Sequence, residues 1–402
     1  VGKYKSAVEP FLLNRMSDPS REQMQLLLED LWTEWKATVG TERKLTPEAL
    51  QALADDKGML LPEEAQAAGV VDRVASLDEV LEELKKLAGE DTEHETFNQM
   101  DLVAYAGIEV HEGKGKNRVA VLYAEGEIVD GEGRSDQIGG DRVSRELRKL
   151  RLDEDVKAVV LRVNSPGGSA SASDLIQREV ILTQKTKPLV VSMGTYAASG
   201  GYWISTYADR IFAHPNTLTG SIGVFGMLPN FQKIANEHGI TWDRVQTAKL
   251  ATLGTVTRPQ TDAELARIQG LTDRIYEQFL TKVSEGRKLE REKVAELAQG
   301  RVWSGVQAQK LGLVDELGTL QDAAKFAAEK AGVGGDYRMD LPAGRKSFAE
   351  QLAESLSDES RPKARSAVDV LLVDVQRQVD TLRALNDPRG VYARMPFDLA
   401  LR

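Results

Sequence analysis

The 402-residue chain contains no cysteine. This absence excludes disulfides, thiolate nucleophiles, zinc–thiolate sites and iron–sulfur ligation. It has only four histidines, His94, His111, His214 and His238, and no two are close enough in sequence to suggest a metal-binding pair. No apolar run approaches the roughly 20 residues that a membrane-spanning helix needs. We therefore expect no metal, no other cofactor and no transmembrane segment in this chain.

An excess of positive charge is also missing. The chain has 52 Lys and Arg against 62 Asp and Glu, for a formal net charge of −10. This balance argues against a nucleic-acid partner. The first residue is Val1 rather than Met, and no charged-then-apolar targeting segment opens the chain. We expect a processed or truncated product.

A faint internal duplication organises the chain. A nearly constant spacing relates Lys5 to Lys249 and Trp32 to Tyr276. The second copy carries most of its predicted strands before Lys249, whereas the first copy has no room for them before Lys5. We predict a tandem repeat with an incomplete first copy. Its parts are the C-terminal part of the first repeat at 1–88, a connector at 89–116, a complete second repeat at 117–334 and a C-terminal extension at 335–402.

Apolar runs rich in β-branched residues predict the strands, which are expected at 118–123, 155–163, 188–193 and 211–213. Apolar spacing and glycine signals predict the helices, which are expected at 173–184, 199–208, 262–284 and 291–299. Strands that alternate with helices indicate an α/β fold with parallel strands.

A glycine loop, Asn164–Ser169, lies between a predicted strand and a predicted helix. Pro166 stiffens this loop, and Gly167 and Gly168 allow backbone angles that leave their N–H groups pointing outward. Such a loop suits the binding of an anion or oxyanion at a helix start. A plain strand-to-helix turn is the alternative.

Ser199 stands among small residues at a second strand-to-helix turn, and Gly200 and Gly201 follow it. The N–H of Gly200 would lie beside an oxyanion formed at Ser199, which is the logic of a nucleophile elbow, although the Gly-x-Ser-x-Gly pattern is absent. Ser199 could equally be the N-cap of a helix.

A serine nucleophile needs a base, and no histidine is convincingly placed to serve. A lysine can act if burial lowers its pKa from about 10.4 to about 7–8. The residues alone do not favour Lys5 over Lys3 or Lys249, and a solvated surface charge is the alternative for each.

Five stretches together resemble the signal peptide peptidases of the protease IV type, a serine–lysine peptidase family related in fold to Clp protease and crotonase. They are Tyr4–Phe11, Leu161–Ser169, Ala197–Ser205, Leu218–Gly223 and Leu385–Tyr392. The resemblance is to the long, duplicated form and covers nearly the whole chain. We expect the N-terminal anchor and the first part of repeat one, which the long form carries, to be missing from this chain.

The resemblance implies a Clp protease/crotonase-like fold and a set of site residues. Ser199 would be the nucleophile, Lys5 the general base and Ser221 the serine that orients the lysine. The backbone around Gly167, Gly168 and Gly200 would supply the oxyanion donors. A groove for apolar peptides would be lined by Ala197, Ala198, Ile222, Val224 and Phe225, and ordinary core packing is the alternative for each of them.

The implied function is that of a serine endopeptidase that degrades cleaved signal peptides and other apolar peptides through an acyl-enzyme. The resemblance also implies a homo-tetramer and a place at the bacterial inner membrane, with the catalytic part on the periplasmic side. Two alternatives stay open. One is a non-catalytic oligomer subunit or scaffold, because the chain is short at its front. The other is a crotonase-like acyl-CoA enzyme.

Overall fold

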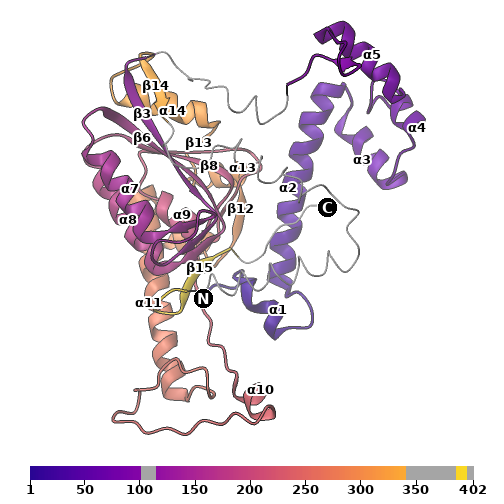
Figure 1. Cartoon of the computed structure of the whole chain (residues 1–402). Coiled ribbons are helices and arrows are strands. Elements are labelled where there is room, and N and C mark those ends of the chain that lie inside the picture. Colours follow the sequence, from indigo (N-terminus) through magenta and orange to yellow (C-terminus); the bar gives the residue numbers. More distant parts are fainter. Residues whose placement is uncertain (101–114, 341–385, 396–402) are drawn as a thin grey trace. The chain divides into compact units, whose positions relative to one another are not determined.

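The computed structural model describes residues 1–100, 115–340 and 386–395. The chain divides into two compact units, which are described separately. The described residues of the first unit are 1–27, 115–340 and 386–395, and those of the second are 28–100. Figure 1 shows the elements and their labels.

The first unit is built on a mostly parallel sheet. Its main path runs β12–β10–β8–β6–β3–β14, with β9 pairing β8 and β13 pairing β9. Only the β10–β12 pair is antiparallel. The strands are β3 (Asn117–Glu125), β6 (Val156–Ser165), β8 (Leu189–Ala198), β9 (Arg210–Ala213), β10 (Leu218–Gly220), β12 (Val302–Ser304), β13 (Glu316–Leu317) and β14 (Tyr337–Asp340).

Helices cover both faces of this sheet, which explains why its strands are apolar runs rather than alternating ones. Along β3, Val119 and Val121 pack with α14, while Ala120 and Leu122 belong to the larger core on the other face. The helices are α7 (Gly140–Leu152), α8 (Ala170–Gln184), α9 (Gly200–Ser205), α11 (Asp262–Arg287), α12 (Arg291–Leu297), α13 (Gly305–Lys310) and α14 (Leu320–Lys330).

A smaller sheet lies beside the carboxyl ends of β6 and β8. Its order is β11–β15–β7–β4–β5. The strands are β4 (Glu127–Val129), β5 (Gln137–Gly139), β7 (Gly167–Ser169), β11 (Phe225–Gly226) and β15 (Val391–Arg394). This sheet therefore joins the predicted glycine loop to a strand from the far C-terminal part of the chain.

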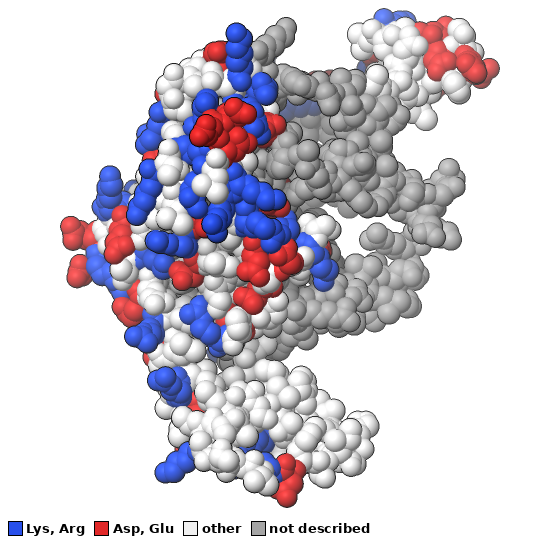
Figure 2. All heavy atoms as spheres, turned by 60° about the vertical axis from the view of Figure 1, so that its left-hand side comes forward, with Lys and Arg blue, Asp and Glu red and all other residues white. Residues whose placement is uncertain are grey.

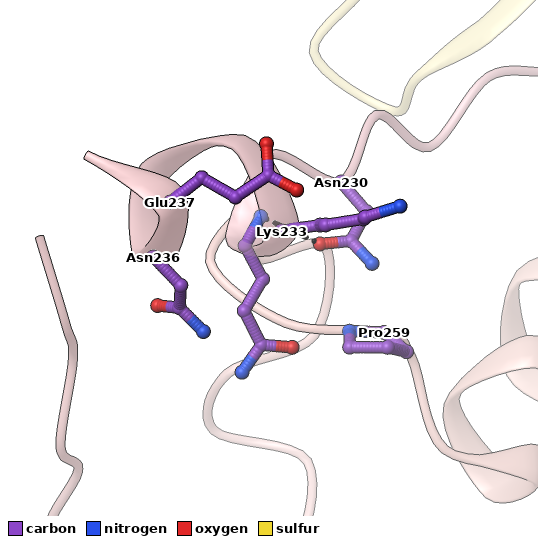
Figure 3. A pocket seen from close by; sticks show the side chains of 6 residues that line it. Asn230, Lys233, Asn236, Glu237 and Pro259 are labelled. Atoms are coloured by element: carbon purple, nitrogen blue, oxygen red, sulfur yellow. Dashed lines mark hydrogen bonds between the residues drawn. The ribbon is translucent and has the colours of Figure 1, made fainter. Parts of the chain in front are cut away.

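The first unit also contains η1 (Ser6–Val8), α1 (Glu9–Leu12) and α10 (Gln232–Glu237). The segment around α10 exposes large apolar side chains, among them Phe231, Ile234 and Val245. Lys and Arg interleave with Asp and Glu over the upper part of the face in Figure 2, whereas the lobe that contains α10 shows few charges. Beside α10 a shallow hollow is lined by Asn230, Gln232, Lys233, Asn236, Glu237 and Pro259 (Figure 3).

The second unit is mainly helical. Its described elements are the part of α2 (Asp18–Arg43) from Leu28 onward, α3 (Pro47–Asp56), α4 (Pro62–Ala67), α5 (Leu77–Ala88), β1 (Glu90–Asp91) and β2 (Thr96–Phe97). Trp32 and Trp35 stack with ring centroids 4.8 Å apart, and Trp32 Nε1 donates to Gln51 Oε1 at 2.6 Å. These contacts tie α2 to α3.

The α/β class predicted from the sequence is confirmed. Each predicted strand and helix is present, although the helix predicted at 199–208 is shorter, ending at Ser205. The predicted extension at 335–402 contains β14 and β15, and its residues 341–385 and 396–402 lie outside the described part of the chain. In the ranges that the structure describes, every helix is too short or too polar to span a bilayer. The tandem repeat stays a prediction.

Candidate active site

Ser199 lies at the junction between β8 and α9 in a strained conformation. Its φ is +54° and its ψ is −111°, a region that side-chain-bearing residues rarely adopt. The backbone is held on both sides, since Ser199 N donates to Gly220 O at 2.8 Å and Trp203 N donates to Ser199 O at 2.8 Å. Ser199 occupies the N-cap position of α9, yet its side chain makes no capping bond. The hydroxyl is therefore available for another partner.

That partner is Lys5. Lys5 Nζ lies 2.7 Å from Ser199 Oγ, 2.8 Å from Ser221 Oγ and 3.0 Å from Ser221 O. Only 6% of Lys5 is exposed, and Ser199 and Ser221 are fully buried. Burial holds the pKa of Lys5 well below its usual range, and the positive charge of Arg394 lowers this pKa further. The geometry thus brings together an amine that favours its neutral form and a hydroxyl.

The segment that carries Lys5 is fixed to the first unit although it opens the chain. Val1 N donates to Val224 O at 2.7 Å, and Tyr4 N donates to Gln299 O at 2.9 Å. Gln23, which is buried, donates from Nε2 to Tyr4 O and accepts from Val302 N. These bonds hold the lysine stem at β12 and β10. No pattern in the sequence indicates this role of Gln23.

Ser221 follows β10 directly and also has a positive φ, +48°. Its N–H donates to Arg301 O at 2.6 Å, so its position is set by the β10–β12 end of the large sheet. Both its carbonyl and its hydroxyl oxygen face the lysine amine. Ser221 therefore makes two of the three hydrogen bonds to Lys5 Nζ, and Ser199 makes the third.

The glycine loop reaches Ser199 from β6 and β7. Gly167 has a φ of +103° and Gly168 a φ of +151°. A Cβ on Gly167 would overlap the carbonyl oxygen of Ala393 and would lie 2.8 Å from Gly200 N, so only glycine fits there. Gly167 N–H does not point freely outward as expected; it donates to Ser165 Oγ at 3.1 Å.

Of the five residues predicted to line an apolar groove, all are buried, and Ala197, Ile222 and Val224 belong to the main core. Phe225 packs against Tyr392 of β15, with ring centroids 5.9 Å apart. Lys249 is exposed in the segment that follows α10. The structure thus brings Lys5, and not Lys249, to Ser199.

Arg394 is a site neighbour that the sequence did not reveal. It pairs in register with Gly167, and its Nε lies 2.9 Å from Glu127 Oε1, with both side chains mostly buried. Its positive charge contributes to the lowered pKa of Lys5. No sequence signal places residue 394 beside residue 5.

A buried serine–lysine pair in an α/β fold is typical of enzymes with a serine nucleophile. In such a pair the amine takes a proton from the hydroxyl, so that the hydroxyl oxygen can attack a carbonyl. The comparisons with known proteins agree with this class. The family model "Peptidase family S49" matches residues 1–91 and 181–334. The chain belongs to peptidase family S49.

Curated relatives are similar over 98% of this chain. The chain is 36% identical over 412 residues to Protease 4 of Salmonella typhi and 37% identical over 417 residues to Protease 4 of Haemophilus influenzae, covering 98% of this chain and 66% of each relative. It is 30% identical over 407 residues to the chloroplastic serine protease SPPA of Arabidopsis thaliana, covering 98% of this chain and 58% of that protein. The chain thus spans slightly less than two thirds of the length of the two bacterial relatives and 58% of the length of the chloroplastic one.

Among solved structures, a ClpP1 mutant from Listeria monocytogenes is similar with a TM-score of 0.35 and 18% identity, over 51% of this chain and 94% of that chain.

Proposed function

We propose that the protein is a serine endopeptidase in which Ser199 is the nucleophile and Lys5 the general base. The observation that carries this proposal is the buried 2.7 Å contact between Lys5 Nζ and Ser199 Oγ. Membership of a peptidase family supports it and gives no support to the acyl-CoA alternative.

The chemistry follows from the protonation state of Lys5. The neutral amine accepts the hydroxyl proton of Ser199 as Oγ attacks the carbonyl carbon of a peptide bond. The lysine then donates this proton to the leaving amine, which departs and leaves an ester on Ser199. Water attacks the ester carbon while Lys5 accepts one of its protons. Lys5 then gives this proton to Ser199 Oγ as the bond between Oγ and the acyl carbon breaks, which releases the second product and restores both the hydroxyl and the neutral amine.

Ser221 orients the base in this proposal. With two of its contacts fixed by Ser221 O and Oγ, the lone pair of the neutral amine is directed at Ser199 Oγ. The developing oxyanion would be stabilised by backbone N–H groups around Gly200, Gly168 and Gly167. The N–H of Gly167 must exchange its bond to Ser165 Oγ before it can contribute.

The proposed substrates are cleaved signal peptides and other apolar peptides. Ala197 and Ala198, which precede Ser199 directly and are buried, support this class, because the transfer of apolar side chains from water to apolar surroundings is favourable. We further propose action at the bacterial inner membrane on its periplasmic side, and assembly into a homo-tetramer. Light scattering of the purified chain tests the tetramer, and a monomer mass would contradict it.

Hydrolysis of an apolar peptide ester by two variants tests the proposed pair. Ser199→Ala and Lys5→Met should each reduce kcat/KM by at least about 10³-fold, because nucleophile and base act as a unit. Lys3→Met is the matched control: Lys3 lies two residues away, over the ring of Tyr4, and its variant should keep its activity. Retained hydrolysis in either of the first two variants would reject the pair, and a folded wild-type chain without any hydrolysis would favour the non-catalytic subunit.

A further inference from the structure

The strand that carries the glycines of the site has no free edge in the residues that the structure describes. β7 pairs with β4 on one side and with β15 on the other. β15 also pairs with β11, which lies four residues beyond Ser221. A four-residue strand from near the C-terminal end thus bridges the two segments that flank Ser199.

The register places β15 directly at the site. Ala393 pairs with Gly168, and Arg394 pairs with Gly167. The carbonyl oxygen of Ala393 lies so close that a Cβ on Gly200 would come within 3.0 Å of it. A backbone carbonyl of β15 therefore approaches both Gly167 and Gly200, the residues proposed to face the carbonyl of a substrate.

The side chains of β15 alternate as those of a bound extended peptide do. Val391 and Ala393 are fully buried and belong to the apolar core of the first unit. Arg394 points to Glu127, and Tyr392 packs on Phe225. Val391, Ala393 and, one residue beyond the strand, Met395 thus present buried apolar side chains at every second place.

Polar bonds at both ends of this strand hold it in its place. Asp387 Oδ2 accepts from Ser169 Oγ at 2.7 Å and from Ser171 N at 2.8 Å, at the start of α8. Arg389 Nε donates to Ser171 Oγ at 2.8 Å. At the other end, Met395 N donates to Pro166 O at 2.6 Å. The segment from Asp387 to Met395 is docked along its whole length.

We propose that the segment Asp387–Met395 occupies the binding position of the substrate peptide, so that an extended peptide binds at β7 only when this segment leaves. This inference rests on the proposed function and adds that a segment of the same chain fills the substrate position. It agrees with the burial of Ser199 and Lys5, because neither group is open to a peptide while β15 is in place. The segment competes as an intramolecular ligand, with an effective concentration on the order of millimolar.

A reversible disulfide that fixes β15 to β11, called the lock below, tests this inference. The chain has no cysteine of its own, so an introduced pair can form a disulfide only with itself within the chain. Phe225→Cys with Tyr392→Cys, and Gly226→Cys with Val391→Cys, join residues that pair across β11 and β15. Antiparallel partners lie about 4.5 or 5.5 Å apart at Cα, within the range of a disulfide. The two pairs are adjacent, so they sample both pair geometries. Asp91→Cys with Thr96→Cys, across β1 and β2, is the control for oxidation itself.

Binding is measured in the Ser199→Ala background, so that it does not depend on hydrolysis. The probe is a fluorescein-labelled peptide with the sequence of residues 387–395, followed by anisotropy. The reduced lock variants should bind the peptide at least about tenfold more tightly than their oxidised forms, since only the reduced strand can leave. The control pair should bind equally in both redox states.

Equal affinity of the oxidised and reduced forms in both lock variants, or tighter binding by the oxidised forms, would overturn the inference. It would mean that β15 is a permanent wall of the site. Failure of the proposed function is seen separately, as loss of peptide-ester hydrolysis in chains that keep Ser199. Redox-dependent binding without any hydrolysis would therefore retain the occupied position and reject the catalytic proposal.

Discussion

Removing the hydroxyl of Ser221 tests how the base is held. In Ser221→Ala, Lys5 Nζ loses its 2.8 Å contact with Ser221 Oγ and keeps the contacts with Ser221 O and Ser199 Oγ. A buried hydrogen bond to a neutral group contributes about 0.5–1.5 kcal/mol, and one to a charged group about 1.5–3 kcal/mol. The bond acts on a neutral amine before the reaction and on a charged one after proton transfer. The variant should therefore lose about 1 kcal/mol of stability and more of its transition-state stabilisation.

In kinetic terms, kcat for an apolar peptide ester should fall about 10- to 150-fold, since each 1.4 kcal/mol corresponds to a factor of ten. KM should change little, because Ser221 is buried behind Lys5 and the change acts through the base. Ser205→Ala is the matched control. Ser205 is also fully buried and donates one bond, to Gly201 O at 2.7 Å, without touching Lys5.

The control should lose similar stability in urea or thermal unfolding and keep its kcat. A Ser221→Ala variant whose kcat falls no further than that of Ser205→Ala would refute the orienting role. A rise in KM at constant kcat would refute it as well.

Three further outcomes concern stability. Gly167→Ala should lower the free energy of unfolding by more than the about 1–2 kcal/mol of a left-handed backbone alone, because the new Cβ would overlap backbone atoms. Gly254→Ala is the control, since Gly254 has a φ of +81° and open space around it, and thermal unfolding of this variant should show only that smaller loss. Lys5→Met should raise the unfolding temperature near neutral pH, because burial of the charged amine destabilises the wild type. Burial lowers the pKa of Lys5, so the free energy of unfolding of the wild type should rise with pH between that lowered pKa and about 10.4. The variant should lack this rise. Hydrogen bonds from Arg258 and from the start of α11 lower the pKa of Glu264 to about 2. The free energy of unfolding of the wild type should therefore fall as the pH falls from about 4.3 toward 2. Glu264→Gln should remove this dependence on pH. A pH profile unchanged by either of the last two substitutions would contradict the corresponding assignment.

The long apolar strands could be predicted because a sheet covered on both faces demands continuous apolar runs, as β6 and β8 have. The short strands β7, β10 and β11 could not, since two or three residues carry no periodicity. β15 was missed for a different reason. Its four residues join a sheet whose other strands lie more than 160 positions earlier, and such pairing is set by the packed core rather than by local sequence.

In the candidate site, the local sequence pattern indicated Ser199 and the glycine loop, but it did not determine the function of either. Whether the side chain of Ser199 caps α9 depends on the direction of that side chain, and the structure shows that it makes no capping bond. Its role as the nucleophile stays a proposal. Lys5 was indicated only by family resemblance, because burial is what distinguishes it from Lys3 and Lys249, and burial arises from the tertiary structure. Arg394 was not indicated at all.

Activation of Ser199 by Lys5 can be measured as the rate of covalent labelling by an alkyl fluorophosphonate, with the modified residue identified by peptide mass spectrometry. The wild-type chain should be labelled at Ser199, with a rate that rises with pH as Lys5 loses its proton, and Lys5→Met should be labelled at least about 100-fold more slowly. Labelling of another residue, or an equal rate at Ser199 with and without Lys5, would contradict the account.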